Sequence, residues 1–385
     1  MLLGTLLTGC AKNAPQDTFQ PAGPNARSID DLQRLLFYVS GAVGLIVFAV
    51  ILAAVIKFKD RGQDIPEQSH GNPKLEIALT ILPAVILAIV AVPTVTKVFE
   101  LDKKDNQCVV NVTGQQWWWE YDYSGVCGGV EIKTPIVTAG ELVIPADTPV
   151  LLRITSRDVI HSFWIPKLNG KRDAVPGRLH TVRLQADEPG LYTGQCTEFC
   201  GLSHARMRQA AVALSKEDFQ TWVDRQSAEY VKPEPGSLAE KGQETFISVC
   251  SKCHQINDLN NADGTPVLAQ PDLYEVSGAA PNLSHLMSRT AFAGWTFDLI
   301  TDACREKLWN AAPADFGKLY LDGLGGDCFN EATLRAWLRN PPAMKPMYVD
   351  PTKLAPTGGR YRGMPNLNLT EDQINQLIAY LLERK

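Results

Sequence analysis

The stretch Gly194-Gln-Cys-Thr-Glu-Phe-Cys-Gly-Leu-Ser-His-Ala-Arg-Met207 decides how the rest of the chain is interpreted. It places two thiols, an imidazole and a thioether close together, at Cys196, Cys200, His204 and Met207. Soft donors of this kind select copper or zinc over magnesium or calcium. A blue-type single copper needs one cysteine, and structural zinc rarely takes methionine. The stretch therefore predicts two copper ions bridged by two thiolates, with one more imidazole from elsewhere.

The missing imidazole is expected from upstream in the same domain, where the candidates are His161 and His180. His161 ends an apolar strand, whereas His180 stands beside a charged run. A lone histidine at the end of such a strand is more often structural, but the loop requires a ligand from outside. We therefore expect His161 to complete the site.

The composition is that of an ordinary globular protein. The chain has 385 residues, of which 45% are hydrophobic, and its net charge is −5. This length predicts two or three domains, and the composition argues against a disordered or nucleic-acid-binding protein. The slight acidity favours a basic partner, because complementary charge speeds encounter. Nine cysteines are too many for incidental use and too few for a disulfide-built scaffold.

Two uncharged stretches, 35–56 and 77–96, are long enough to cross a bilayer as helices. Neither shows the polar face expected of a buried helix in a soluble core. The sequence therefore predicts a membrane hairpin over 30–100, with helices near 35–57 and 76–98. Basic residues put the loop between them in the cytoplasm, so both chain ends face outward. These residues are Lys57, Lys59, Arg61 and Lys74.

The first ten residues, MLLGTLLTGC, end like a bacterial lipoprotein cleavage site, with Cys10 as the acylated residue. The alternative is a truncated signal segment or a wrongly chosen start, because no basic residues precede the apolar run. Residues 11–34 are polar and predict an exposed lead-in.

Glu76 stands at the cytoplasmic start of the second membrane helix. A carboxylate there is stabilised by the helix dipole. An acid at a membrane boundary can also serve a proton path. The residues alone favour the first interpretation.

Residues 104–228 contain short β-branched and aromatic runs separated by turn residues, which indicates a β-sandwich or barrel. Cys108 and Cys127 bracket the first expected hairpin and lie outside the membrane, where disulfides persist. We therefore predict a bond between them.

The same hairpin carries Trp117, Trp118 and Trp119. Alternate residues of a strand face opposite sides, so Trp117 and Trp119 share one face and Trp118 takes the other. One face is expected to lie in the core. The other would then present an exposed aromatic patch, which often marks a docking site, here a place where electrons enter.

A proline-rich linker over 229–237 separates a last domain, 238–385. The motif Cys250-Ser-Lys-Cys253-His254 is the attachment signature of c-type haem, with His254 as an axial ligand. A redox dithiol or half of a zinc site would not require the following histidine. Because a distal methionine usually completes such a haem, the candidates are Met344, Met347 and Met364, of which we favour Met364. Cys304 and Cys328 are expected to form a second disulfide.

Taken together, the membrane hairpin, the tryptophan-rich strand, His161 and the Cys196–Met207 motif resemble subunit II of haem–copper cytochrome c oxidase, over residues 30–228. The remainder resembles the cytochrome c domain fused to subunit II in caa3-type bacterial oxidases. This resemblance implies a multi-domain membrane protein with a two-helix transmembrane hairpin, a cupredoxin-like CuA domain and an all-α cytochrome c domain. It would lie in the bacterial cell membrane.

The resemblance also implies the ligands and partners. The copper ligands would be the side chains of His161, Cys196, Cys200, His204 and Met207 with the carbonyl of Glu198. The Glu198 side chain would also reach a magnesium ion at the subunit I boundary. Glu76 matches a position that guards a proton path in subunit I, and the tryptophans match the family's site of electron input. Partners would be subunit I, the other oxidase subunits, the bilayer, and a donor cytochrome c or cytochrome bc complex.

Three other functions compete with an electron relay. A copper-delivery protein would explain the soft donors but not a covalent haem. A membrane redox sensor or structural anchor would require a cytoplasmic output domain, which the predicted topology lacks. Nitrous oxide reductase has a similar dicopper site, but it also needs a histidine-rich copper cluster, and this chain has six histidines in all.

Overall fold

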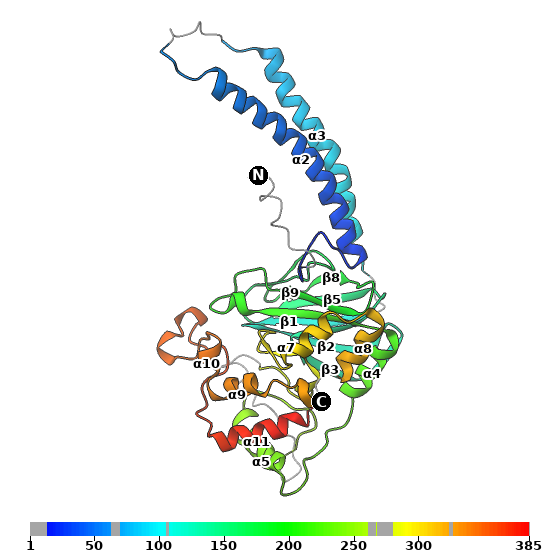
Figure 1. Ribbon diagram of the computed structural model, residues 1–385, viewed down its shortest axis with the longest axis vertical. Coiled ribbons are helices and arrows are strands. Elements are labelled where there is room, and N and C mark those ends of the chain that lie inside the picture. Colours follow the sequence, from blue (N-terminus) through cyan, green and yellow to red (C-terminus); the bar gives the residue numbers. More distant parts are fainter. Residues whose placement is uncertain are drawn as a thin grey trace. The chain divides into compact units, whose positions relative to one another are not determined.

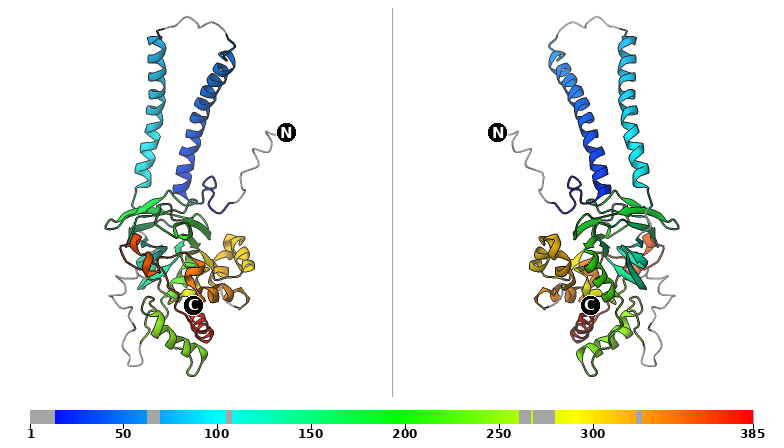
Figure 2. Two further views of the ribbon diagram at one scale, coloured as in Figure 1. Left: turned by 90° about the vertical axis from the view of Figure 1, so that its left-hand side faces the viewer. Right: turned by 90° about the vertical axis from the view of Figure 1, so that its right-hand side faces the viewer.

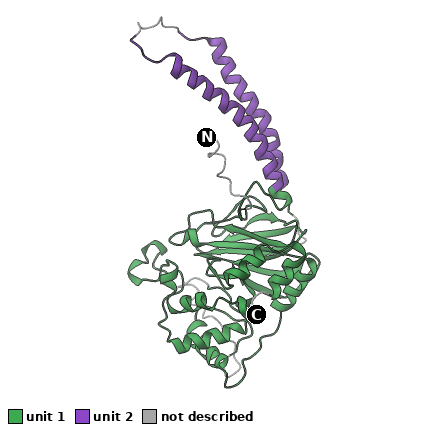
Figure 3. Ribbon diagram, in the orientation of Figure 1, with its two compact units in different colours: residues 1–26, 104–385 green, residues 27–103 purple. Residues whose placement is uncertain are grey.

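The computed structural model describes residues 14–62, 70–104, 108–260, 267, 280–322 and 326–384. The chain divides into two compact units, residues 27–103 and residues 1–26 with 104–385 (Figure 3). Cys10, the predicted lipidation site, lies outside the described residues.

Two long helices, α2 (Pro24–Lys57) and α3 (Pro73–Leu101), make up the first unit (Figure 1). Both are long and apolar enough to cross a membrane, and their apolar windows bury no residue. A core helix of a soluble protein would bury one face, so the exposed apolar surface fits the predicted membrane hairpin.

Both helices begin earlier than the sequence predicted. Residues 24–34 were expected to form an exposed lead-in, but the structure places them in α2, and that expectation was wrong. The helix starts at Pro24, whose fixed φ suits a first helical turn. Arg34 pairs with Asp30 one turn earlier, at 2.7 Å. The polar residues 24–34 therefore belong to the same helix as the apolar stretch.

A β-sandwich forms the first part of the second unit (Figures 1 and 2). One sheet has the strand order β3-β2-β1-β5-β8, a second has the order β4-β10-β9, and β6 pairs with β7. The strands are β1 (Val109–Gln115), β2 (Trp118–Cys127), β3 (Val130–Ala139), β4 (Glu141–Pro145), β5 (Val150–Ser156), β6 (His161–Phe163), β7 (Arg172–Ala174), β8 (His180–Leu184), β9 (Gly190–Gln195) and β10 (Arg208–Leu214). The predicted β-sandwich is confirmed.

Helix α4 (Lys216–Gln226) packs its apolar side chains into the sandwich core. Its Trp222 packs edge-on against Tyr123 of β2, with ring centroids 5.2 Å apart. The disulfide between Cys108 and Cys127 ties the start of β1 to the end of β2. Both of these cysteines are buried, so the bond lies within the core.

The C-terminal region is mainly helical. Its helices are α5 (Leu238–Thr245), η2 (Phe246–Cys250), η3 (Leu286–Ser288), α7 (Asp302–Trp309), α8 (Pro313–Asp322), η4 (Gly326–Cys328), α9 (Glu331–Arg339), α10 (Pro341–Met344), η5 (Pro351–Lys353), η6 (Ala355–Thr357) and α11 (Glu371–Leu382). The first and last of the α-helices, α5 and α11, pack side by side (Figure 1). A β-carbon at Gly242 would collide with the Gln376 carbonyl, so this crossing requires glycine.

This region differs in two ways from the all-α cytochrome domain that the sequence suggested. A short hairpin joins β11 (Ala291–Phe292) to β12 (Phe297–Asp298). In addition, α7 and α8 contribute Leu308, Phe316 and Tyr320 to the core cluster of the sandwich, not to the second core around α5 and α11. The segment enclosed by the Cys304–Cys328 disulfide therefore belongs by packing to the β-sandwich.

Candidate metal centre and adjoining cavity

The Cys/His/Met loop runs from the end of β9, through the short helix η1 (His204–Arg206), to the start of β10. Because β9 and β10 are antiparallel partners, they hold the two ends of this loop together. The Cys196 amide donates to the Met207 carbonyl at 2.9 Å, which closes the loop at its base. His161 is the first residue of the short strand β6. The backbone amide of Thr197, in the ligand loop, donates to the carbonyl of Ser162, the next residue of β6, at 3.0 Å.

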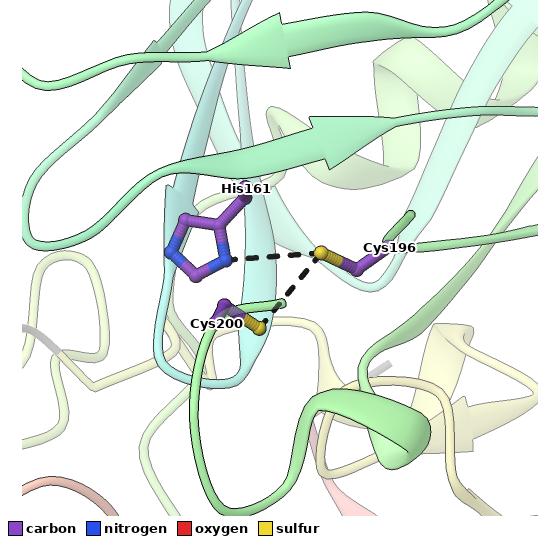
Figure 4. A group of neighbouring side chains, drawn as sticks. All are labelled: His161, Cys196 and Cys200. Atoms are coloured by element: carbon purple, nitrogen blue, oxygen red, sulfur yellow. Dashed lines mark hydrogen bonds between the residues drawn. The ribbon is translucent and has the colours of Figure 1, made fainter. Parts of the chain in front are cut away.

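This arrangement brings the predicted donors together (Figure 4). The ligand atoms of His161, Cys196 and Cys200 lie within 4.8 Å of one another, and all three residues are buried. The two sulfurs are 3.8 Å apart, and His161 Nδ1 is 4.0 Å from Cys196 Sγ. Such a cluster fits a metal that takes sulfur and nitrogen ligands.

The remaining predicted ligands border the same sulfurs. His204 Nδ1 lies 3.5 Å and Met207 Sδ 3.8 Å from Cys200 Sγ. The Glu198 carbonyl oxygen is 3.3 Å from Cys196 Sγ, while the Glu198 side chain is exposed. The alternative histidine, His180, instead pairs through Nδ1 with the Asp173 carbonyl in the β7–β8 region.

The two thiols have opposite tendencies to ionise. A hydrogen bond from Cys200 lowers the pKa of Cys196 to about 4, although burial opposes this shift. The same bond and burial raise the pKa of Cys200. One thiolate is thus stabilised by the other thiol.

Asp158 contacts the predicted ligand His161, and the sequence pattern did not single it out. Its Oδ1 lies 2.8 Å from His161 Nε2, and its Oδ2 accepts the Gln116 amide at 2.7 Å. With Nε2 occupied in this way, the His161 Nδ1 faces the sulfurs, as carboxylates commonly arrange for metal-binding imidazoles. The sequence signal was available, because Asp158 lies three residues before His161.

The tryptophans are buried, so the expectation of an exposed aromatic patch was wrong. Trp117, Trp118 and Trp119 are 2%, 7% and 0% exposed. Trp119 packs in the sandwich core beside His161, with ring centroids 5.8 Å apart. Trp117 is covered by the C-terminal region, where the Tyr348 ring lies 5.4 Å from it. The alternation of side chains along a strand could not predict that the C-terminal region packs over Trp117.

The C-terminal region contains a cavity that the Cys-x-x-Cys-His motif lines. Cys250, Cys253, His254 and Met364 all face it, together with apolar side chains of α9 and α11. The tryptophan-bearing turn forms another part of the lining, at Gln116, Trp117 and Trp118. An apolar cavity with two thiols, an imidazole and a thioether has the donors that a c-type haem requires.

His254 is held in one orientation by the Pro281 carbonyl, 2.8 Å from its Nδ1. Burial lowers the pKa of His254, so the neutral imidazole is favoured, and its Nε2 is left to bind a metal. Buried Arg289 also lines the cavity, and its Nε finds no hydrogen-bond partner among the described residues. This orphaned donor fits a bound group that carries negative charge.

The methionine candidates differ in position. Met364 and Met347 line the cavity, whereas Met344 is not among its lining residues. Gly363 adopts φ +108, and a β-carbon there would collide with the Met347 side chain. The Met364 loop is therefore shaped around Met347.

Glu76 lies in the first turn of α3. Its Oε1 accepts the backbone amide of Asn72, the N-cap residue, at 3.3 Å. The geometry is that of a helix-capping carboxylate.

Comparison with known proteins identifies the family. Two family models match, "Cytochrome C oxidase subunit II, periplasmic domain" over residues 108–213 and "Cytochrome C oxidase subunit II, transmembrane domain" over residues 12–96. Cytochrome c oxidase subunit 2 of Alkalihalophilus pseudofirmus is 32% identical, over 100% of this chain and 95% of the relative. The same subunit of Bacillus sp. (strain PS3) is 31% identical, with the same coverage of each chain.

A solved structure gives a further similarity. The crystal structure of the periplasmic domain of subunit II of cytochrome oxidase from Bradyrhizobium japonicum is 31% identical to this chain. The match covers 32% of this chain and 94% of that structure, with a TM-score of 0.28.

Two membrane-length helices followed by a β-sandwich with clustered sulfur and imidazole donors define a membrane-anchored protein with an external domain. The chain belongs to the cytochrome c oxidase subunit II family. It is a subunit of a haem–copper oxidoreductase, and its family implies copper of the CuA type.

The Asp158 contact predicts a measurable loss of copper binding. Replacing Asp158 by Asn should lower copper affinity by about 10-fold to 100-fold, because the imidazole loses its orienting carboxylate. Competition with a copper chelator measures this, and Glu131→Gln, an exposed carboxylate on β3, is the control. Equal affinities in both variants would show that Asp158 does not orient the ligand.

Proposed function

We propose that this subunit relays electrons through two centres of its own. Electrons would pass from a donor cytochrome to a covalent haem c in the C-terminal region, then to a dicopper centre in the sandwich. They would leave for subunit I, where oxygen is reduced to water with proton pumping. The supporting observation is a single cavity that Cys250, His254 and Met364 line together with Trp117.

The copper ions would be held by six groups of the sandwich. These are the side chains of His161, Cys196, Cys200, His204 and Met207, and the carbonyl of Glu198. When bound, a copper pair bridged by two thiolates supplies a one-electron carrier whose charge is shared between two metals. The chain's part is to fix the ligands, since a rigid cage changes little between redox states.

The haem would be held by bonds from the chain's own sulfurs and imidazole. Cys250 and Cys253 would form the two thioether links, and His254 Nε2 and the Met364 sulfur would bind the iron. Methionine as the distal ligand raises the reduction potential. Apolar side chains such as Phe246 and Leu338 would pack against the haem.

The same proposal includes further assignments. The exposed Glu198 side chain would reach magnesium at the boundary with subunit I. Glu76 would guard a proton path, in addition to capping α3. Both termini would face outward, with Cys10 acylated. The donor would be a cytochrome c or a cytochrome bc complex.

Metal analysis of the purified full-length chain tests the proposal directly. We expect two copper ions and one covalent haem per chain, together with the near-infrared band of a mixed-valence dicopper pair. One copper per chain, zinc in place of copper, or haem that is lost on denaturation would contradict the assignment. Haem that is lost on denaturation would contradict the haem relay alone and would not bear on the dicopper centre.

The distal ligand is tested by substitution. Met364→Leu should turn the haem high-spin, because leucine offers no donor and the iron loses its sixth ligand. Met344→Leu, in a methionine outside the cavity lining, is the matched control and should leave the spectrum unchanged. If Met347→Leu produces the high-spin spectrum and Met364→Leu does not, the ligand is Met347.

A further inference from the structure

The segment 344–364, which we call the connector, lies between the copper-ligand loop and the cavity. The Ser203 hydroxyl donates to the Pro346 carbonyl, and the Arg206 guanidinium donates to the Met344 carbonyl. The connector is also paired with itself, since Tyr348 and Arg362 exchange backbone hydrogen bonds of 3.0 and 2.9 Å. It thus contacts the ligand loop and returns to the cavity within a few residues of Met364.

Lys345 is the first of two buried cations on the connector. It is 3% exposed, and its Nζ donates to the Trp117 carbonyl at 3.0 Å and to the Ala293 carbonyl at 2.7 Å. Burial lowers the pKa of Lys345 to about 7. A buried amine is costly unless it is hydrogen-bonded, so its two carbonyl partners define where it must lie. Lys345 therefore joins the tryptophan turn to the β11–β12 hairpin.

Arg362 is the second buried cation, 7% exposed. Its Nε lies 3.7 Å from Asp158 Oδ2. The other oxygen of Asp158 lies 2.8 Å from His161 Nε2. Arg362 also precedes Met364 by two residues, so one short series of contacts runs from the cavity loop to a predicted copper ligand.

We propose that Lys345 and Arg362 are positioning residues that fix the Met364 loop against Trp117 and the Asp158–His161 pair. This inference rests on the proposed function, because it assigns the two residues the task of setting the geometry between the haem and copper sites. The connector also covers Trp117, because the Tyr348 ring packs against its ring and Lys345 donates to its carbonyl. An external donor would consequently have to deliver its electron to the haem region and not to Trp117.

Other contacts keep the C-terminal region on the sandwich when these cations are removed. Buried Glu141 of β4 accepts the Thr290 amide at 2.8 Å, the Trp295 indole at 3.1 Å and the Tyr320 hydroxyl at 2.9 Å. The apolar contacts of Phe316 in α8 with the sandwich core remain as well. Neutral variants should therefore fold, with the connector alone loosened.

The experiment uses the full-length chain in detergent, with haem and copper contents measured first. Arg362→Gln and Lys345→Met are compared with wild type and with Arg360→Gln, an exposed arginine of the same loop. The haem is photoreduced, and its reoxidation is followed as the copper pair gains one electron. Backbone hydrogen exchange of residues 345–364 is measured on the same samples, as a readout independent of oxidase activity.

We expect each buried-cation variant to slow this electron transfer several-fold, because the rate falls as the separation of the two redox sites grows. Exchange in 345–364 should accelerate, while the near-infrared band stays unchanged. Arg362→Lys should recover part of the rate, which a merely structural role would not require. Arg360→Gln should behave as wild type.

If both variants keep both cofactors and show the electron-transfer rate and the hydrogen exchange of the wild type, the inference is overturned. The proposed function would then remain intact. A wild-type chain without covalent haem or without copper would instead contradict the proposed function itself. Lys345 is farther than Arg362 from Met364 along the chain. If the Arg362→Gln variant loses its haem, the Lys345→Met variant therefore gives the deciding result.

Discussion

The backbone carbonyl of Cys200 accepts two buried hydrogen bonds, from the Gln116 side chain at 2.7 Å and from the Trp117 indole at 3.0 Å. A carbonyl has two acceptor positions, and here both are used by one turn of the chain. These bonds fix the ligand loop relative to the β1–β2 turn. The Cys200 sulfur then faces Cys196 and His204, while the Trp117 ring faces the C-terminal region. One carbonyl oxygen thus joins the metal-ligand loop to the turn that carries Trp117.

The contact between sandwich and C-terminal region is built from buried polar groups as much as from apolar ones. Glu141, Lys345 and the Arg362–Asp158 pair are all largely withdrawn from water. Buried charges contribute little net stability after desolvation, but they require defined partners and so favour one arrangement. An interface of this kind is suited to holding two redox sites in a constant geometry. Part of its apolar contact comes from α7 and α8, in the segment closed by the Cys304–Cys328 disulfide.

Much of this could be predicted from local pattern. Uncharged length predicted the hairpin, and the β-branched runs predicted the sandwich. The spacing from Cys196 to Met207 predicted the donors that the structure brings together. Contacts between distant segments were missed, because residue alternation shows which side chains share a face but not what covers that face. Lys345 and Trp117 are 228 residues apart in sequence, and a lysine in a loop carries no sign of burial. The packing of α7 and α8 onto the sandwich was missed for the same reason.

The central claim is that two thiolates hold a pair of copper ions in one electronic unit. Electron paramagnetic resonance of the oxidised full-length chain tests it most directly, since copper nuclei split the signal of an unpaired electron that they share. The account predicts hyperfine structure from two equivalent copper nuclei, which is lost in Cys200→Ser. Hyperfine structure from a single copper nucleus in the fully copper-loaded chain would contradict it.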